Sequence, residues 1–210
     1  MIQIVKFFFE FLFRFLLFSI FISTVACVDV KCEFGLSKWE ALGEVYTCDV
    51  KDFIITKPNE NVTSILGAHL PGKSNIDVKK LNIAEQTCFY LPNDINKFFP
   101  NLEGLRVAQS GLVSLSQSDL SVFPKLINCD MFNNYLETLS EDLFEKNPLI
   151  VYLYFGDNRL KEIGYDIFRP LKSLKKAVFQ GNICVRNNAD SQNEVTALQK
   201  KINGNCVPNK

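Results

Sequence analysis

Residues that could carry catalysis are few in this chain and follow no pattern that would activate them. The single histidine, His69, precedes a Leu-Pro-Gly turn, and no serine or cysteine stands in a motif that places a nucleophile beside a base. Glu141 and Asp142 are adjacent carboxylates, but they fall on a segment that we expect to face solvent. The sequence has no phosphate-binding glycine loop and no metal-ligand spacing. We therefore expect a protein that is not an enzyme and that needs no metal or other cofactor.

Composition narrows the kind of surface that the protein can offer a partner. The chain has 210 residues, which suffices for one domain with a hydrophobic core, and 47% of them are hydrophobic. Its 23 basic residues are balanced by 23 acidic residues. Proteins that bind nucleic acid or an anionic membrane surface usually carry an excess of positive charge, so we expect neither partner.

The main feature of the sequence is a repeat with a period of 24 residues, from Val78 to Cys184. Its apolar residues follow the pattern L-x-x-L-x-L-x-x-N-x-L-x-x-L. The second leucine position holds Leu81, Leu105, Cys129, Leu153 and Ala177. The polar position holds Gln86, Ser110, Asn134, Asn158 and Asn182. The chain is therefore built from about five similar units.

Each unit has a simple physical interpretation. The short alternation of apolar and polar residues predicts a strand with one buried face, and the remaining residues must return the chain so that the next strand lies parallel to it. The polar position can bond backbone groups of the neighbouring unit that water does not reach. Residues that could cap a short helical turn recur in the return half, at Asp94, Ser118, Asp142 and Asp166. The expected fold is an α/β solenoid with a parallel sheet on its concave side.

This pattern resembles the leucine-rich repeat, and the 24-residue spacing resembles the class common in extracellular proteins. The resemblance covers the chain from Cys32 to Cys206. It implies a horseshoe of about five repeats in residues 78–182, with an N-terminal cap in residues 28–77 and a C-terminal cap in residues 183–210. It also implies that disulfides hold the two caps, because the open ends of a solenoid need covers.

Six of the seven cysteines have an expected place in such a fold. We predict the bridges Cys32–Cys48 before the repeats and Cys184–Cys206 after them, each stabilising the fold by about 3 kcal/mol through loop closure. Cys88 and Cys129 occupy leucine positions of different repeats, too far apart for a bridge. We expect them to be buried thiols that replace aliphatic side chains.

Residues 1–27 have the order of a secretory signal peptide. A basic residue precedes a run rich in Phe, Leu and Ile, and a segment of small residues follows the run. Cleavage after Ala26 or after Cys27 would satisfy the requirement for small residues equally well. Glu10 and Arg14 interrupt the run, which argues against an uncleaved membrane anchor. We therefore expect a secreted, extracellular protein that does not contact the membrane after cleavage.

The N-terminal cap contains several predicted elements. Apolar clusters from Val45 to Thr56 predict a hairpin or an edge strand, and Val62 to Leu70 predicts one irregular strand. Leu70-Pro71-Gly72 predicts a turn. Asn61 begins the one N-glycosylation acceptor motif in the sequence, so a glycan is expected there, or else a bare surface asparagine if the motif lies on a strand.

The C-terminal cap is expected to end in a helix. Val195, Leu198 and Ile202 share one helical face between Glu194 and Ile202. Asn193 is the candidate N-cap of this helix, and Gly204 is the candidate stop signal. The helix would cover the last repeat.

The expected register also indicates which side chains the concave sheet presents to a partner. Phe132, Tyr152 and Tyr154 are large aromatic residues that should point from the sheet into water, and Arg106 and Asp130 lie beside them. Aromatic residues in such positions often anchor an interface, although these three could also cover one another and bind nothing. These five residues form the candidate binding site.

The resemblance implies a function in recognition. Extracellular leucine-rich repeat proteins serve in innate immunity, adhesion and matrix organisation, so we expect a secreted module that binds another extracellular protein or a glycan on its concave face. Two alternatives remain open. One is a structural or matrix protein whose repeats associate into a homo-oligomer, and the other is a receptor-like protein tethered to a membrane by its N-terminal run.

Overall fold

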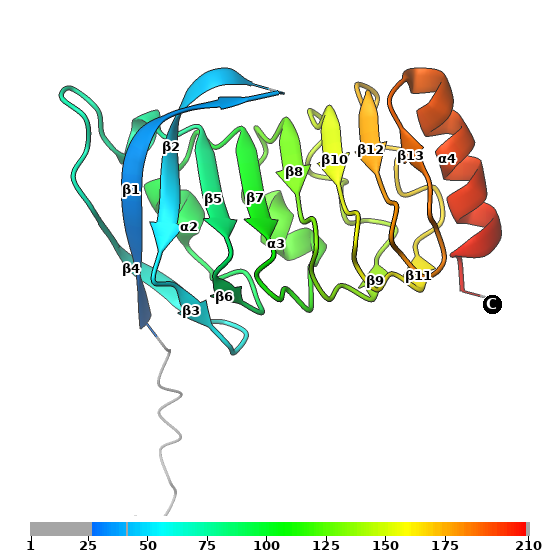
Figure 1. Ribbon diagram of the computed structural model, residues 1–210, viewed down its shortest axis with the longest axis horizontal. Coiled ribbons are helices and arrows are strands. Elements are labelled where there is room, and N and C mark those ends of the chain that lie inside the picture. The colour runs from blue at the N-terminus through cyan, green and yellow to red at the C-terminus, as the bar shows by residue number, and fades with distance from the viewer. Residues whose placement is uncertain (1–26, 41, 209–210) are drawn as a thin grey trace, which may run out of the picture.

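The protein folds mostly as β-sheet. The computed structural model describes residues 27–40 and 42–208, so the predicted signal peptide lies outside the described residues apart from Cys27. The main element is a nine-stranded mixed sheet with the strand order β13-β12-β10-β8-β7-β5-β2-β1-β4 (Figure 1). Two small sheets, β11-β9 and β3-β6, lie along one end of its strands (Figure 1).

Five short parallel strands at the centre of the sheet come from the repeat. They are β5 (Lys80–Ala84), β7 (Gly104–Ala108), β8 (Asn128–Asp130), β10 (Tyr152–Tyr154) and β12 (Lys176–Val178). Each strand pairs with the next at positions 24 residues apart, as Leu81 does with Leu105. The core side chains of the series are fully buried: Leu81, Leu105, Cys129, Leu153 and Ala177. The structure therefore contains the parallel strands that the repeat predicts.

Asparagine side chains tie each unit to the one before it, just after these strands. Asn158 donates from Nδ2 to the carbonyl oxygen of Met131 at 2.9 Å, and its Oδ1 accepts from the N–H of Leu136 at 3.1 Å. Asn134 and Asn182 make equivalent bonds. In the first two units a glutamine and a serine stand in this position, and both also bond backbone groups of neighbouring turns. Buried backbone groups between the units thus obtain their partners from side chains.

An antiparallel hairpin begins the sheet. β1 (Cys27–Trp39) pairs with β2 (Gly43–Lys51), and β2 also pairs in parallel with β5, with Cys48 beside Leu81. The sequence predicted a hairpin or edge strand only from Val45 to Thr56, so the hairpin is longer and starts earlier than expected. In the first half of β1, the buried Val30 and Cys32 alternate with exposed residues, which is the pattern of a strand with one face on the core.

β4 (Asn61–Leu66) pairs with β1 and forms one edge of the nine-stranded sheet. It ends before Leu70, where the sequence placed the end of the strand. The reason is Gly67, whose φ of 131° suits glycine and whose Cα lies so close to the carbonyl of Cys32 that a side chain would collide with it. The turn predicted at Leu70-Pro71-Gly72 is confirmed by a 2.9 Å bond from the N–H of Lys73 to the carbonyl oxygen of Leu70.

The return halves of the units contain less helix than an α/β solenoid was expected to have. The described helices there are single turns, α2 (Ile95–Phe98) and α3 (Gln117–Ser121), and a 3₁₀ turn η1 (Asn75–Asp77) precedes the first unit. The later returns are hydrogen-bonded turns beside the short strands β9 (Thr138–Leu139) and β11 (Glu162–Ile163). The small sheet β3-β6 joins β3 (Ile54–Ile55) to β6 (Thr87–Cys88).

The predicted helix caps in these returns were wrong in detail. α3 is capped by Ser116 rather than Ser118, because the N–H and the hydroxyl of Ser116 both donate to the Asp119 carboxylate, at 2.7 Å and 2.6 Å. Asp94 precedes α2, but its backbone is left-handed and its side chain makes no capping bond. Asp142 and Asp166 lie within turns rather than before helices. The choice between polar residues two positions apart depends on local backbone angles that their types do not reveal.

A single longer helix, α4 (Gln192–Asn205), covers the C-terminal end of the described chain after β13 (Asn188–Ala189) (Figure 1). Its buried face carries Val195, Leu198 and Ile202, as expected. Its predicted ends were wrong, because Ser191 caps it by accepting from the N–H of Glu194, so that Asn193 and Gly204 both lie inside it. In the described ranges, no helix combines the length and the hydrophobicity needed to cross a membrane.

Two disulfides join Cys32 to Cys48 and Cys184 to Cys206, which are the pairs expected from the sequence. The first crosses the β1–β2 hairpin, and the second ties the C-terminal end of α4 to the last unit. Cys88 and Cys129 are fully buried free thiols, also as expected. Disulfides of this kind persist in oxidising compartments, so the pair fits an extracellular protein.

We expect Cys88 and Cys129 to resist alkylation by iodoacetamide at pH 8 in the native protein and to react once it is unfolded. Burial raises the pKa of the Cys88 thiol to about 12 and raises that of Cys129 as well, so the reactive thiolate is scarce. Because both pKa values lie above the unfolded value of about 8.5, rising pH above about 9 should also favour the unfolded chain. Peptide mass analysis after labelling with and without guanidinium checks this, and fast labelling of either native thiol would contradict its burial.

Candidate functional site

One face of the central strands packs on the core, and the opposite face, here called the open face, carries two columns of aligned side chains. The first column runs across the strands as Lys80, Gly104, Asn128, Tyr152 and Lys176. The second column runs as Asn82, Arg106, Asp130, Tyr154 and Val178. Four of the five predicted site residues therefore lie in these columns, and Phe132 lies just beyond the second one.

Arg106 and Asp130 bind each other rather than facing solvent separately. Arg106 Nε donates to Asp130 Oδ2 at 2.9 Å, and Arg106 Nη1 lies 3.3 Å from Asn82 Oδ1. Asn82 in turn donates to Asp49 Oδ1 at 2.7 Å, so the network extends to β2. Burial raises the pKa of Asp130, whose side chain is only 12% exposed. A partner could reach Arg106, whose side chain is 30% exposed, far more easily than Asp130.

The three aromatic residues are half-buried rather than fully exposed. The ring of Phe132 lies against Gly156, where a side chain would also crowd Val178. Tyr152 stands between Asn128 and Lys176 in the first column. Each of the three side chains is thus partly covered by its surroundings and partly accessible to solvent.

Tyr154 contacts a part of the chain that the sequence did not connect with this face. Its hydroxyl donates to Glu40 Oε2 at 3.1 Å, and Lys176 Nζ lies 5.8 Å from its ring centroid. Burial, followed by the nearby Glu40 carboxylate, raises the pKa of the Tyr154 hydroxyl above its ordinary value. Tyr154 therefore stays neutral and remains a hydrogen-bond donor.

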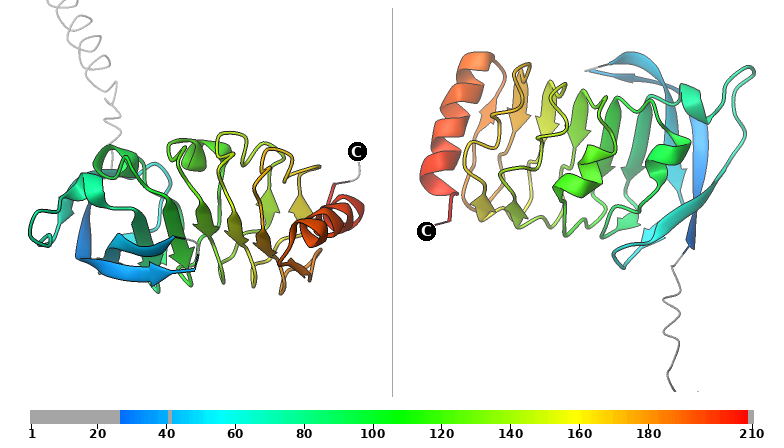
Figure 2. Two further views of the ribbon diagram at one scale, coloured as in Figure 1. Left: turned by 90° about the horizontal axis from the view of Figure 1, so that it is seen from above. Right: turned by 180° about the vertical axis from the view of Figure 1, so that it is seen from behind.

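Glu40 belongs to the end of the β1–β2 hairpin, and Trp39, Glu40 and Leu42 are here called the hairpin tip. The hairpin leans across the ends of β5 and β7 toward β8 on the side of the open face (Figures 1 and 2). Lys80 Nζ lies 4.5 Å from the Trp39 ring centroid, within cation–π range. Burial lowers the pKa of Lys80, which is 8% exposed.

Gly104 provides the space in which Trp39 lies. A side-chain carbon at Gly104 would collide with the Trp39 ring and would stand 3.1 Å from Leu42 Cδ1. Every other position of the first column has a side chain that extends beyond Cβ, so the glycine leaves a socket in the column. Glu40 follows Trp39 and meets Lys176 Nζ at 3.5 Å as well as the Tyr154 hydroxyl.

Asn128 lies in the first column between this socket and Tyr152. It is fully buried, and neither its Oδ1 nor its Nδ2 has a hydrogen-bond partner among the described residues. A buried amide without partners costs free energy, about 1 to 3 kcal/mol for each unsatisfied group. Most buried polar groups in folded proteins are satisfied, so Asn128 marks this part of the open face as unusual.

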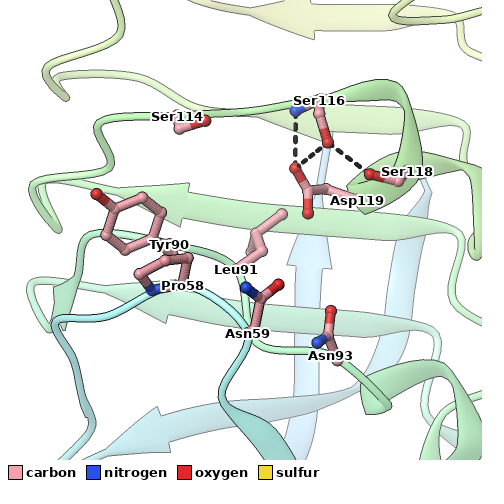
Figure 3. Close-up of a pocket in the computed structure, with 9 residues that line it drawn as sticks. All are labelled: Pro58, Asn59, Tyr90, Leu91, Asn93, Ser114, Ser116, Ser118 and Asp119. Atoms are coloured by element: carbon pink, nitrogen blue, oxygen red, sulfur yellow. Dashed lines mark hydrogen bonds between the residues drawn. The ribbon is translucent and has the colours of Figure 1, made fainter.

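A separate hollow lies away from the open face, between the loop after β3 and the turns before α2 and α3 (Figure 3). Its lining is polar, but Ser116, Ser118 and Asp119 bond one another there as the cap of α3 (Figure 3). Those groups are therefore already engaged, which makes the hollow a weaker candidate for a ligand than the open face.

Asn61, the predicted glycan acceptor, is the first residue of β4 and lines a neighbouring hollow. Its Oδ1 accepts from Asn93 Nδ2 at 3.1 Å. The atom to which a glycan would be joined, Asn61 Nδ2, makes no hydrogen bond to the described residues. Thr63, the third residue of the motif, is exposed.

His69 contributes to the N-terminal part of the fold. Its ring lies on Phe34 with the ring centroids 3.8 Å apart. Its Nδ1 is 3.0 Å from the Tyr46 hydroxyl, and its Nε2 is 3.0 Å from Asn75 Oδ1. Both ring nitrogens thus have structural partners.

The sequence pattern placed Gly104 and Asn128 on the same face as the aromatic and charged residues but gave them no role in the site, and it did not indicate the hairpin tip. The available signal was weak: Trp39 is the one tryptophan of the chain, and Gly104 lacks a side chain where the other residues of its column have one. The contact from Glu40 to Tyr154 spans 114 residues and follows no sequence pattern. Comparison of the sequence with models of known protein families and with curated proteins found no match.

Proposed function

We propose that this chain is a secreted leucine-rich repeat protein that binds another extracellular protein through the open face, which would be the concave face of its solenoid. The observation that carries the proposal is the group Tyr152, Tyr154 and Phe132, three half-buried aromatic residues on one face beside the partly exposed Arg106. Tyrosine and arginine dominate the energetic centres of protein interfaces, because they combine a large apolar area with polar groups.

Several further features support this proposal. The pairing of strands at intervals of 24 residues fits a stack of equivalent repeats. The asparagine bonds between units fit the role of the recurring polar position in such repeats. The disulfides at the two ends fit covers of an extracellular solenoid, and the order of residues 1–27 fits a secretory signal.

We expect Tyr154→Asp to abolish partner binding while leaving the melting temperature nearly unchanged. The substitution places a charge at the centre of the aromatic group, where a partner would have to desolvate it. Wild-type and variant proteins would be immobilised and exposed to native extracellular fluid, and bound proteins would be identified by mass. Thermal melts of the same preparations report the fold.

The matched control is Tyr165→Asp. Tyr165 is 57% exposed and lies in a return turn, outside the open face. The substitution therefore makes the same chemical change at a different place on the surface. A partner retained by the wild type and by Tyr165→Asp but lost by Tyr154→Asp would locate the interface. Equal capture by all three proteins, or loss of the fold in Tyr154→Asp, would remove the support for this face.

A further inference from the structure

The hairpin tip occupies the open face in the way that a bound peptide would. We infer that the tip is a built-in ligand, and that the surface beneath it recognises a protein segment in which an aromatic side chain is followed by a carboxylate. This inference deepens the proposed function and rests on it. It names the chemistry of the partner and adds a competitor that the partner must displace.

The aromatic part of the inference comes from the Trp39 socket. Lys80 Nζ approaches the ring to 4.5 Å, and Gly104 supplies the space in which the ring lies. Lys80 is nearly buried, and a cation–π contact is stronger when the cation is shielded from water. The socket therefore offers shape and charge to any aromatic ring that reaches it, whether from the tip or from another protein.

The acidic part comes from the next residue of the tip. The Glu40 carboxylate accepts from the Tyr154 hydroxyl at 3.1 Å and lies 3.5 Å from Lys176 Nζ. The Glu40 side chain is 62% exposed, so these contacts are weak enough to be exchanged for those of a competing carboxylate. The Trp39 socket and the place where the Glu40 carboxylate binds are as far apart as the side chains of two adjacent residues of the tip.

Asn128 indicates why the partner that displaces the tip should be a peptide rather than a small aromatic acid. Its amide is buried between the socket and Tyr152 and lacks partners in the closed arrangement. An extended peptide carries both an N–H donor and a carbonyl acceptor at every residue, so it could satisfy both groups of Asn128. The tip leaves the Asn128 amide unsatisfied, which favours replacement of the tip by a segment that satisfies it.

The construction of the hairpin allows the tip to move without unfolding the protein. The Cys32–Cys48 disulfide and the pairing of β2 with β5 at Thr47 to Asp49 hold the base of the hairpin. Beyond this base, the β1 and β2 residues pair with each other out to Trp39 and Gly43. Among the interactions that the structure describes, only side-chain contacts join the tip to the open face.

The test uses the tip sequence itself as the probe. A synthetic peptide with the sequence of Ser37 to Val45 would be titrated into the double variant Trp39→Ala/Glu40→Ala, whose own tip lacks both recognition groups. Because Trp39 is the one tryptophan of the chain, the peptide would then be the sole source of tryptophan fluorescence. We expect the peptide to bind the double variant saturably. We expect it to bind the wild type at least about tenfold more weakly, because the attached tip occupies the socket there.

Two controls locate the binding and test its chemistry. A peptide with lysine in place of Glu40 keeps the fluorophore and should bind the double variant about tenfold more weakly, because its charge is repelled by Lys176. Adding Gly104→Leu to the double variant fills the socket and should abolish binding of the original peptide. Intact disulfides and an unchanged melting transition show that each variant is folded.

The inference is overturned if the folded double variant does not bind the peptide, or if Gly104→Leu leaves the binding unchanged. Its failure can be told apart from failure of the proposed function, because the peptide probe needs no extracellular partner. Peptide binding without any captured protein would leave a self-closing hairpin and remove the recognition module. Capture of a partner through Tyr154 without peptide binding would support the recognition module and remove the inference about the tip.

Discussion

Asn134→Ala is expected to lower the free energy of unfolding by about 2 to 5 kcal/mol, since it leaves several buried backbone groups without partners. Asn134 Oδ1 accepts from the N–H groups of Ser110 and Leu112, at 3.1 Å and 3.0 Å, and its Nδ2 donates to the carbonyl oxygen of Val107 at 2.7 Å. Asn134 is only 2% exposed, so water cannot readily replace its amide. Alanine also leaves a small cavity, which adds to the loss.

The measurement is a thermal or denaturant unfolding curve with both disulfides intact. At about 2 to 4 °C per kcal/mol for a chain of this size, the melting temperature should fall by roughly 4 to 20 °C. Asn187→Ala is the matched control, because Asn187 is exposed and its side chain makes no hydrogen bond to the described residues. If the two variants melted alike, the asparagine bonds between units would contribute no more than a surface amide.

Gly164→Ala is expected to destabilise the protein by about 3 kcal/mol, at the upper end of the range for overpacked sites. A Cβ at Gly164 would collide with the backbone nitrogen and Cα of Glu141, one unit earlier. The N–H of Gly164 also donates to the carbonyl oxygen of Leu139 at 2.8 Å, which holds the two turns at this short separation. Backbone atoms of a stacked turn cannot move aside as a flexible side chain could, so the units would have to separate.

Gly204→Ala is the control, and its effect should have the opposite sign. Gly204 lies inside α4, and a Cβ there would meet no atom within 4 Å. Alanine in a helix is favoured over glycine by about 0.5 to 1 kcal/mol, so this variant should be slightly more stable than the wild type. Equal destabilisation by the two substitutions would show that the close contact with Glu141 is not what makes Gly164 necessary.

These two sites show which parts of the fold can be read from the sequence. The position of Asn134 follows from the 24-residue period, because a recurring polar residue among apolar ones indicates a recurring backbone partner. Gly164 carries no such signal. Its position cannot hold a side chain because two stacked turns lie too close together there. Sequence reasoning therefore anticipated the bonds that join the units but not the tightness with which the turns stack.

The candidate site divides in the same way. The register of the repeat predicts that Arg106, Asp130, Tyr152 and Tyr154 share one face, because each strand repeats the last at a constant spacing, and the strand pairing confirms this. The same register did not reveal that Arg106 and Asp130 bind each other at 2.9 Å or that the aromatic rings are half-buried. Side-chain reach and burial depend on how closely neighbouring strands approach, which the spacing alone does not determine.

The parallel strands, the polar residues that join the units and the disulfide pairs could all be predicted from the sequence, since each relates residues through a constant spacing or through the two ends of the repeat. The position of the hairpin tip over the open face, in contrast, is visible only in the folded chain. That contact joins Glu40 to Tyr154, 114 residues away, and depends on the direction in which the β1–β2 hairpin leaves the sheet. Strand twist and the packing of Trp39 against Gly104 set this direction, and neither follows from a local pattern.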